Sequence, residues 1–116
     1  MEKEVILVTD KISAKTKEFS LQYLPSQAQV VFSDGSEEIL EQYLPRAQVL
    51  ITSTKGISPE MLRKAEKCLY IQKYGAGVNN IDIPGATQRG IPVGNTPGTN
   101  SRSVAETTLT LILAVY

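Results

Sequence analysis

The sequence predicts an α/β fold with a doubly wound, mainly parallel sheet of five strands. Short apolar runs alternate along the chain with longer helix-forming segments, and Gly, Pro, Ser and Asp separate them. The first apolar run is continuous, which is typical of a strand buried on both faces of a parallel sheet. Strict alternation of strands and helices indicates βαβ units, which place helices on both faces of the sheet.

Five apolar runs are the predicted strands. The first, VILV at residues 5–8, ends at Thr9 and Asp10. The other runs comprise residues 29–32, 49–51, 69–74 and 92–94. Ligands of open parallel sheets bind beyond the carboxyl ends of the strands. The candidate ligand-binding loops are therefore 9–10, 33–34, 52–55, 75–80 and 95–100.

Four predicted helices connect these strands. They comprise residues 13–24 before Pro25, 36–44 before Pro45, 58–67, and 81–89 before Gly90. Ser58 and Pro59 form a strong helix start, because Ser caps the free amides and Pro is pre-organised at the first helical position. The first helix has only a weak apolar stripe, in which Phe19, Tyr23 and Leu24 are the apolar residues.

A fifth helix is predicted near the end of the chain. Ser103 and Glu106 fit the capping box that opens many helices. The segment that begins at Leu109 and ends at Tyr116 is apolar around its whole circumference, as in a helix buried on all sides. Such a helix either forms one wall of this domain or packs against a second domain or subunit. We favour the second alternative, because exposing several of these side chains is costly.

Composition excludes several classes of function. The 116 residues contain twelve Lys and Arg and twelve Asp and Glu, so the net charge is zero and neither nucleic acid nor an anionic membrane is an expected partner. No apolar run approaches the roughly 20 residues of a membrane-spanning helix. The chain has no His, which excludes Ser-His-Asp catalysis within it. Its one cysteine, Cys68, cannot form a disulfide within the chain, and no Cys/His spacing supports a zinc site. We expect one cytoplasmic domain.

The most informative loop follows the fourth predicted strand, in the sequence YGAGVNNID at residues 74–82. Gly75 and Gly77 allow a sharp turn whose amides approach a ligand closely, and such a nest suits a small carboxylate. The spacing differs from the dinucleotide fingerprint Gly-x-Gly-x-x-Gly, because Asn80 stands at the third glycine position. The alternative is a glycine-rich turn without a ligand.

A second loop precedes the last predicted helix. Asn100 and Ser101 lie just before a helix start, where free amides and the helix dipole favour an anion. Arg102 is a candidate partner for a substrate carboxylate. The alternative is that Asn100, Ser101 or Ser103 only caps the helix.

Together the two loops resemble one family. YGAGVNNID at 74–82 and ATQRGIPVGNTPGTNSRSVAE at 86–106 are similar to the D-isomer-specific 2-hydroxyacid dehydrogenases, with the strongest match over residues 70–116. The resemblance implies a flavodoxin-like substrate domain over residues 1–100. It also implies that residues 101–116 form a helix that crosses to a Rossmann domain for NAD, which this chain lacks.

The resemblance also implies roles for individual residues. The backbone amides of Ala76 and Gly77 would hold the substrate carboxylate, and Asn100 would hydrogen-bond the substrate. Ser101 would lie near the nicotinamide end of NAD. Ser53, at the end of the third strand, is a weaker candidate for substrate binding, as is Thr54.

The family's catalytic Arg, Glu or Asp, and His lie after the segment that matches this chain. We therefore expect the chain alone to bind a 2-hydroxy or 2-oxo carboxylate without catalysing hydride transfer, and the intact enzyme to form a homodimer. Asn79 replaces the family's usual Asp, and Thr107 replaces a frequent His. The alternative to a dehydrogenase domain is a free-standing α/β binding or regulatory module that dimerises through its last helix.

Overall fold

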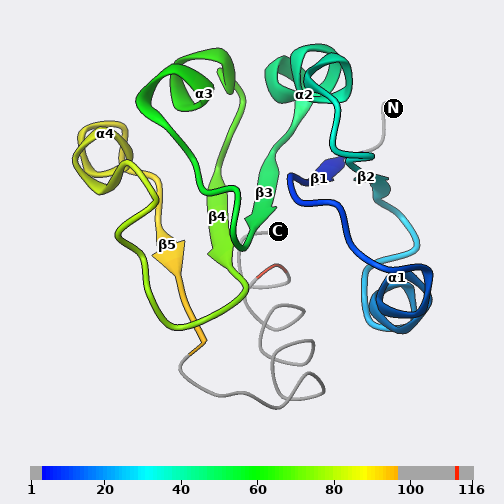
Figure 1. Ribbon diagram of the computed structural model, residues 1–116. Helices are drawn as coiled ribbons and strands as arrows, with labels where there is room; N and C mark the ends of the chain where they lie inside the picture. Colours follow the sequence, from blue (N-terminus) through cyan, green and yellow to red (C-terminus); the bar gives the residue numbers. More distant parts are fainter. Residues whose placement is uncertain (1–3, 97–111, 113–116) are drawn as a thin grey trace.

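The computed structural model describes residues 4–96 and Ile112. Its five strands form one sheet in the order β2-β1-β3-β4-β5, and every neighbouring pair is parallel (Figure 1). The strands are β1 (Val5–Val8), β2 (Gln29–Phe32), β3 (Val49–Thr52), β4 (Tyr70–Lys73) and β5 (Val93–Gly94). This order is that of flavodoxin-like sheets, so the predicted α/β fold is confirmed.

Burial explains which strands lie in the middle of the sheet. All four residues of β1, β3 and β4 are buried, whereas β2 and β5 at the two edges are only half-buried. In the central pairing Leu7 lies opposite both Val31 and Leu50. The continuous apolar runs therefore belong to the strands that are covered on both faces.

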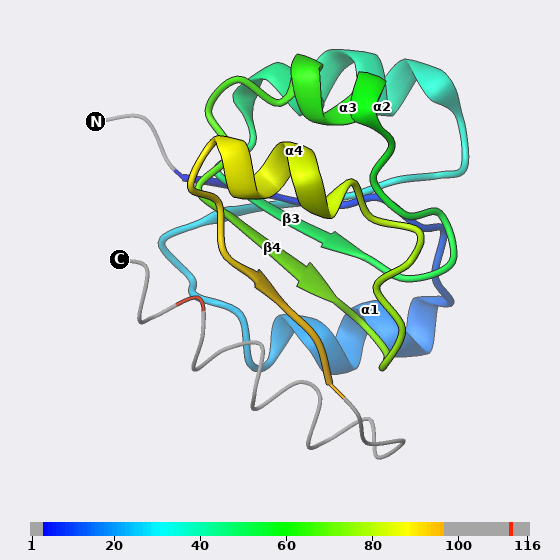
Figure 2. The same cartoon turned by 90° about the vertical axis from the view of Figure 1, so that its left-hand side faces the viewer.

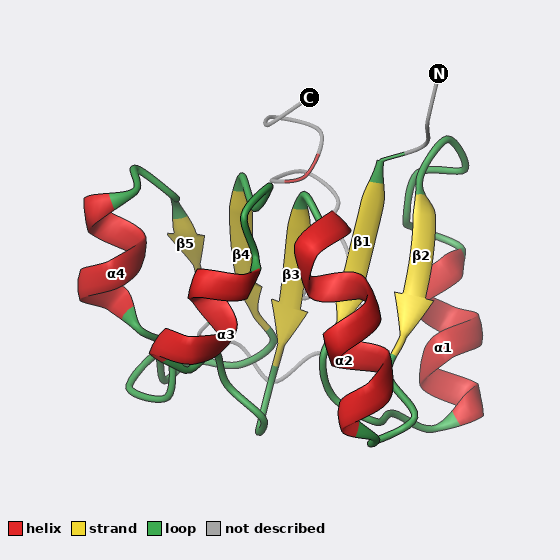
Figure 3. Cartoon of the chain, turned by 90° about the horizontal axis from the view of Figure 1, so that it is seen from above, coloured by secondary structure: helices red, strands yellow, loops and turns green. Residues whose placement is uncertain are grey.

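Helices cover both faces of the sheet. Figures 1 and 2 show α2 (Glu37–Tyr43), α3 (Pro59–Lys64) and α4 (Ile83–Gln88) on one face and α1 (Ala14–Leu21) on the other. Figure 3 shows the strands lying side by side, with their carboxyl ends at the same edge. Among the described residues, no helix is long and apolar enough to span a membrane.

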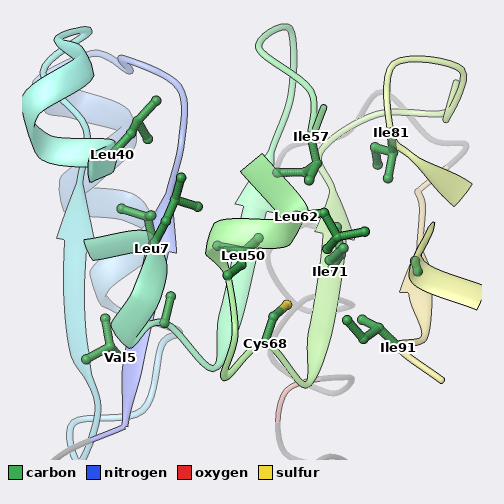
Figure 4. Packing of buried hydrophobic residues seen from close by; sticks show 14 residues of the cluster. Val5, Leu7, Leu40, Leu50, Ile57, Leu62, Cys68, Ile71, Ile81 and Ile91 are labelled. Carbon is green, nitrogen blue, oxygen red and sulfur yellow. The ribbon is translucent and has the colours of Figure 1, made fainter. Parts of the chain in front are cut away.

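The larger core lies between the sheet and α2, α3 and α4. Leu7, Leu50 and Ile71 project from the strands toward Leu40 and Leu62 of the helices (Figure 4). The opposite face has a smaller cluster formed by Ile6, Val8, Val49, Ile51, Tyr70 and Ile112. Ile112 is helical and fully buried in this second cluster.

Several predicted boundaries were wrong by a few residues. The first helix ends at Leu21 instead of residue 24, and none of its residues is buried. The third ends at Lys64 instead of residue 67, because Ala65 leaves the helical conformation at φ −83° and ψ 65°. Gly90 follows α4 with φ +68°, the left-handed conformation that its predicted role in ending this helix requires. The prediction for residues 101–116 lies outside the described residues, apart from Ile112.

Candidate functional site

Two loops lie side by side at the carboxyl edge of the sheet. One joins β3 to α3 and the other joins β4 to α4 (Figure 1). The Ile57 N–H donates to the Asn80 carbonyl oxygen at 3.0 Å, and the Asp82 N–H donates to the Ile57 carbonyl oxygen at 2.8 Å. The two loops therefore continue the parallel pairing of their strands through the isolated bridge between Ile57 and Ile81.

Gly56 makes this close approach possible. Its φ is +74°, and a Cβ placed on it would lie 2.3 Å from the Asn80 carbonyl oxygen. Only glycine tolerates both the left-handed backbone and the contact with another backbone. Gly56 was not predicted from the sequence to have this role.

Asp10 holds the start of the β3–α3 loop. Its carboxylate accepts the Ser53 N–H at 2.6 Å and the Lys55 N–H at 2.7 Å. The Thr9 and Thr52 hydroxyls lie 3.3 Å from the same carboxylate. An acid at the end of the first buried strand thus fixes a loop that leaves a neighbouring strand.

The Gly75–Gly77 turn is fastened to the chain that follows β5. The Gly75 N–H donates to the Thr96 hydroxyl at 3.2 Å, and the Thr96 N–H donates to the Gly75 carbonyl oxygen at 2.9 Å. The Asn95 side chain donates to the Ala76 carbonyl oxygen at 2.7 Å. Gly75 adopts φ +144°, which explains why a glycine stands there.

The same turn leaves two amides available. Within residues 4–96, the N–H groups of Ala76 and Gly77 donate to no acceptor, and both residues are exposed. Two adjacent free amides at the end of a buried strand can bind one anion, as backbone nests do. The geometry therefore suits a small carboxylate.

Comparison with known proteins identifies the family. Residues 6–110 match the catalytic domain of the D-isomer specific 2-hydroxyacid dehydrogenases. The chain belongs to this family. It is 37% identical over 111 residues to D-3-phosphoglycerate dehydrogenase of Methanocaldococcus jannaschii, covering 94% of this chain and 20% of the relative. It is 42% identical over 79 residues to glyoxylate reductase of Thermofilum pendens, covering 68% and 23%.

A solved dehydrogenase has the same fold. The NAD⁺-bound 3-phosphoglycerate dehydrogenase of Entamoeba histolytica superposes with a TM-score of 0.76 at 27% identity, over 96% of this chain and 38% of the other. The chain thus spans about a fifth of the length of the first curated relatives and little more than a third of this structure. The predicted resemblance to 2-hydroxyacid dehydrogenases is confirmed.

Ser53, a predicted substrate ligand, is the first residue of the β3–α3 loop. The Ser53 hydroxyl donates its one proton to the Tyr74 carbonyl oxygen at 3.1 Å. The hydroxyl oxygen can therefore bind a substrate only by accepting a hydrogen bond. Thr54 beside it is exposed. Asn100 and Ser101, the other predicted ligands, lie outside the described residues.

Ser53 also borders a cavity of about 310 Å³ beneath α1. Its walls combine apolar side chains of β1, β2 and β3 with several hydroxyls, two of which belong to Thr16 and Ser20 of α1, and Tyr74 lines it as well. The lining residues include Val8, Ile12, Leu24, Phe32, Ile51 and Tyr23. The cavity therefore adjoins the two loops from the face of the sheet that α1 covers.

The described part of the dehydrogenase domain does not fit the pyrophosphate of NAD. A dinucleotide is usually held by free amides at a helix start that follows a glycine-rich turn. Here the Asp82 carboxylate caps α4 by accepting the Gly85 N–H at 3.2 Å, so a negative charge already occupies the helix start. No cluster of three metal-ligating side chains lies within the described ranges.

Proposed function

We propose that this chain is the substrate-binding domain of an NAD-dependent D-2-hydroxyacid dehydrogenase. In this role the Ala76 and Gly77 amides hold the carboxylate of a 2-hydroxy or 2-oxo acid. The observation that carries the proposal is this pair of exposed amides, which donate to no acceptor within residues 4–96 and lie on a turn that Thr96 and Asn95 fasten in place. The family match supports the choice of a 2-hydroxy acid.

The chain's own contribution is to bind and orient the substrate. Two donors on one carboxylate fix the direction of the bond to C2, which is the carbon whose oxidation state changes. The partly buried hydroxyl of Ser53 adds an acceptor near the same turn. Orientation of this kind lowers the entropic cost of reaction once the other reactant is in place.

NAD and the catalytic acid–base group are supplied from outside the described residues in this proposal. The helix start at α4 is capped by Asp82, and the 116 residues contain no His. We therefore propose that the chain alone is inactive and that Asn100 and Ser101 complete the site in an intact cytoplasmic enzyme. Homodimerisation of that enzyme belongs to the same proposal, and its molar mass in solution tests it.

Amide chemical shifts test the carboxylate site directly. We would titrate the ¹⁵N-labelled chain with pyruvate and, as a control without a carboxylate, with methyl pyruvate. Pyruvate is expected to shift the Ala76 and Gly77 resonances in a saturable manner, and methyl pyruvate to leave them in place. Ala76→Pro removes one donor and should abolish the response, whereas Ala76→Gly keeps it. Equal shifts with both ligands would contradict the proposal.

A further inference from the structure

Lys73 is a buried cation without an acidic partner in the described structure. It is the last residue of β4 and is only 8% exposed. Its ammonium group donates to the Ser53 carbonyl oxygen and, at 3.0 Å, to the Asn80 side-chain oxygen. Burying a charge is costly unless hydrogen bonds replace the lost water, and these two acceptors stabilise the buried ammonium group.

Asn80 completes the connection between the loops. Its side-chain amide donates to the Ser53 carbonyl oxygen at 2.9 Å and to the Thr54 carbonyl oxygen at 3.3 Å. The Ser53 carbonyl oxygen thus receives donors from both Lys73 and Asn80. We call this group of Lys73, Asn80 and the Ser53 carbonyl the loop clamp.

The loop clamp lies directly beside the proposed carboxylate site. Lys73 immediately precedes Tyr74 and the Gly75–Gly77 turn, and a Cβ placed on Gly75 would lie 3.7 Å from the Lys73 Cε. The lysine side chain therefore passes along the backbone of the turn. Separating the two loops would leave a buried ammonium group without its acceptors. This cost favours a single relative position of the two loops.

We propose that Lys73 is a positioning residue for the carboxylate site. Through the loop clamp it fixes the β3–α3 loop, which carries Ser53, relative to the turn that carries the Ala76 and Gly77 amides. This inference rests on the proposed function for its ligand. The lysine acts through backbone placement and does not itself touch the substrate.

Two variants remove the clamp in different ways. Lys73→Met keeps the aliphatic volume and removes the donor, and Asn80→Ala alters an exposed residue whose loss does not threaten the core. Lys73→Arg retains a cationic donor as the conservative replacement, and Lys15→Met on the exposed surface of α1 is the matched control. For each chain we would measure pyruvate affinity at the Ala76 and Gly77 amides and hydrogen exchange at Ile57 and Leu50.

The expected result separates positioning from general stability. Lys73→Met and Asn80→Ala should weaken pyruvate binding about 3- to 10-fold and speed exchange at Ile57, whose N–H donates to Asn80. Exchange at Leu50 in the central strand should stay unchanged, and Lys73→Arg should recover part of the affinity. If Lys73→Met fails to fold, Asn80→Ala alone decides.

The outcomes also distinguish this inference from the proposed function. Pyruvate affinity and Ile57 exchange at wild-type values in both clamp variants would overturn the role of Lys73 and leave the carboxylate site intact. A wild-type chain that shows no response to pyruvate would overturn the carboxylate site itself. The role of Lys73 in that site would then be overturned as well.

Discussion

The Asp10 carboxylate accepts the backbone N–H of Ser53 at 2.6 Å, although 43 positions separate the two residues in the sequence. A second carboxylate oxygen accepts the Lys55 N–H at 2.7 Å. One acid after β1 therefore accepts two backbone N–H groups at the start of the β3–α3 loop. The conformation of this loop depends on a residue from a different βα unit.

Replacing Asp10 should destabilise the fold and release this loop. Hydrogen bonds to charged groups contribute about 1.5–3 kcal/mol each. Asp10 accepts two of them but is only half-buried, and water weakens both, so we expect Asp10→Ala to lower the free energy of unfolding by roughly 2–4 kcal/mol. Asp34→Ala is the matched control, because the exposed Asp34 accepts the Ser36 N–H within its own surface loop. Urea unfolding followed by circular dichroism measures both. Equal small losses would contradict the role assigned to Asp10.

Gly56 and Gly90 offer a matched pair of glycines. Both have positive φ, at +74° and +68°, but a Cβ on Gly56 meets the Asn80 backbone oxygen at 2.3 Å whereas a Cβ on Gly90 meets nothing within 4 Å. Gly90→Ala should cost only the left-handed backbone, about 1–2 kcal/mol. Gly56→Ala should cost clearly more in the same unfolding measurement, because a backbone must also move. Equal losses would show that the two loops separate easily.

The fold could be predicted from sequence because its signals are local. Continuous apolar runs such as VILV at residues 5–8 mark strands buried on both faces, and Ser58 with Pro59 marks a helix start. Helix ends were predicted less well. The first helix has no buried residue, so no periodic stripe marks where it stops.

The site could be predicted only in part. The glycine-rich turn has a sequence signature, and the structure places Ala76 and Gly77 on it. Asp10 and Asn80 lie in loops predicted to bind a ligand, but their hydrogen bonds and those of Lys73 to the β3–α3 loop were missed. These bonds join different βα units, and hydrogen bonds of that range leave no pattern in a single sequence. One signal was present: Lys73 ends a buried strand, where a charged residue is unexpected.

Helix caps provide a further prediction. The Ser58 hydroxyl accepts the Met61 N–H at 3.1 Å at the start of α3, whereas the Ser36 side chain makes no cap hydrogen bond at the start of α2. Ser58→Ala should therefore lower the free energy of unfolding by about 1 kcal/mol, and Ser36→Ala by less. Thermal unfolding of the two variants side by side checks the order. A larger loss at Ser36 would contradict it.

Cys68 predicts how stability responds to alkaline pH. Burial raises the pKa of its thiol from 9.0 to about 11. The folded chain therefore keeps this proton at a pH where the unfolded chain has lost it. The resulting stabilisation is complete below about pH 9 and is lost as the pH rises through about 11, and two pKa units correspond to about 3 kcal/mol.

Cys68→Ala should remove this part of the pH dependence. Between pH 9 and 11 the wild-type free energy of unfolding should fall more steeply than that of the variant. The cavity left by the substitution lowers the free energy of unfolding of the variant at every pH and does not change this slope. Burial also raises the pKa of Tyr70, to about 12, so both chains should still lose stability at the upper end of the range. Urea unfolding at pH 7, 9, 10 and 11 gives the two curves. Parallel curves would show that the thiol is not the group that titrates, because only its removal distinguishes the two chains.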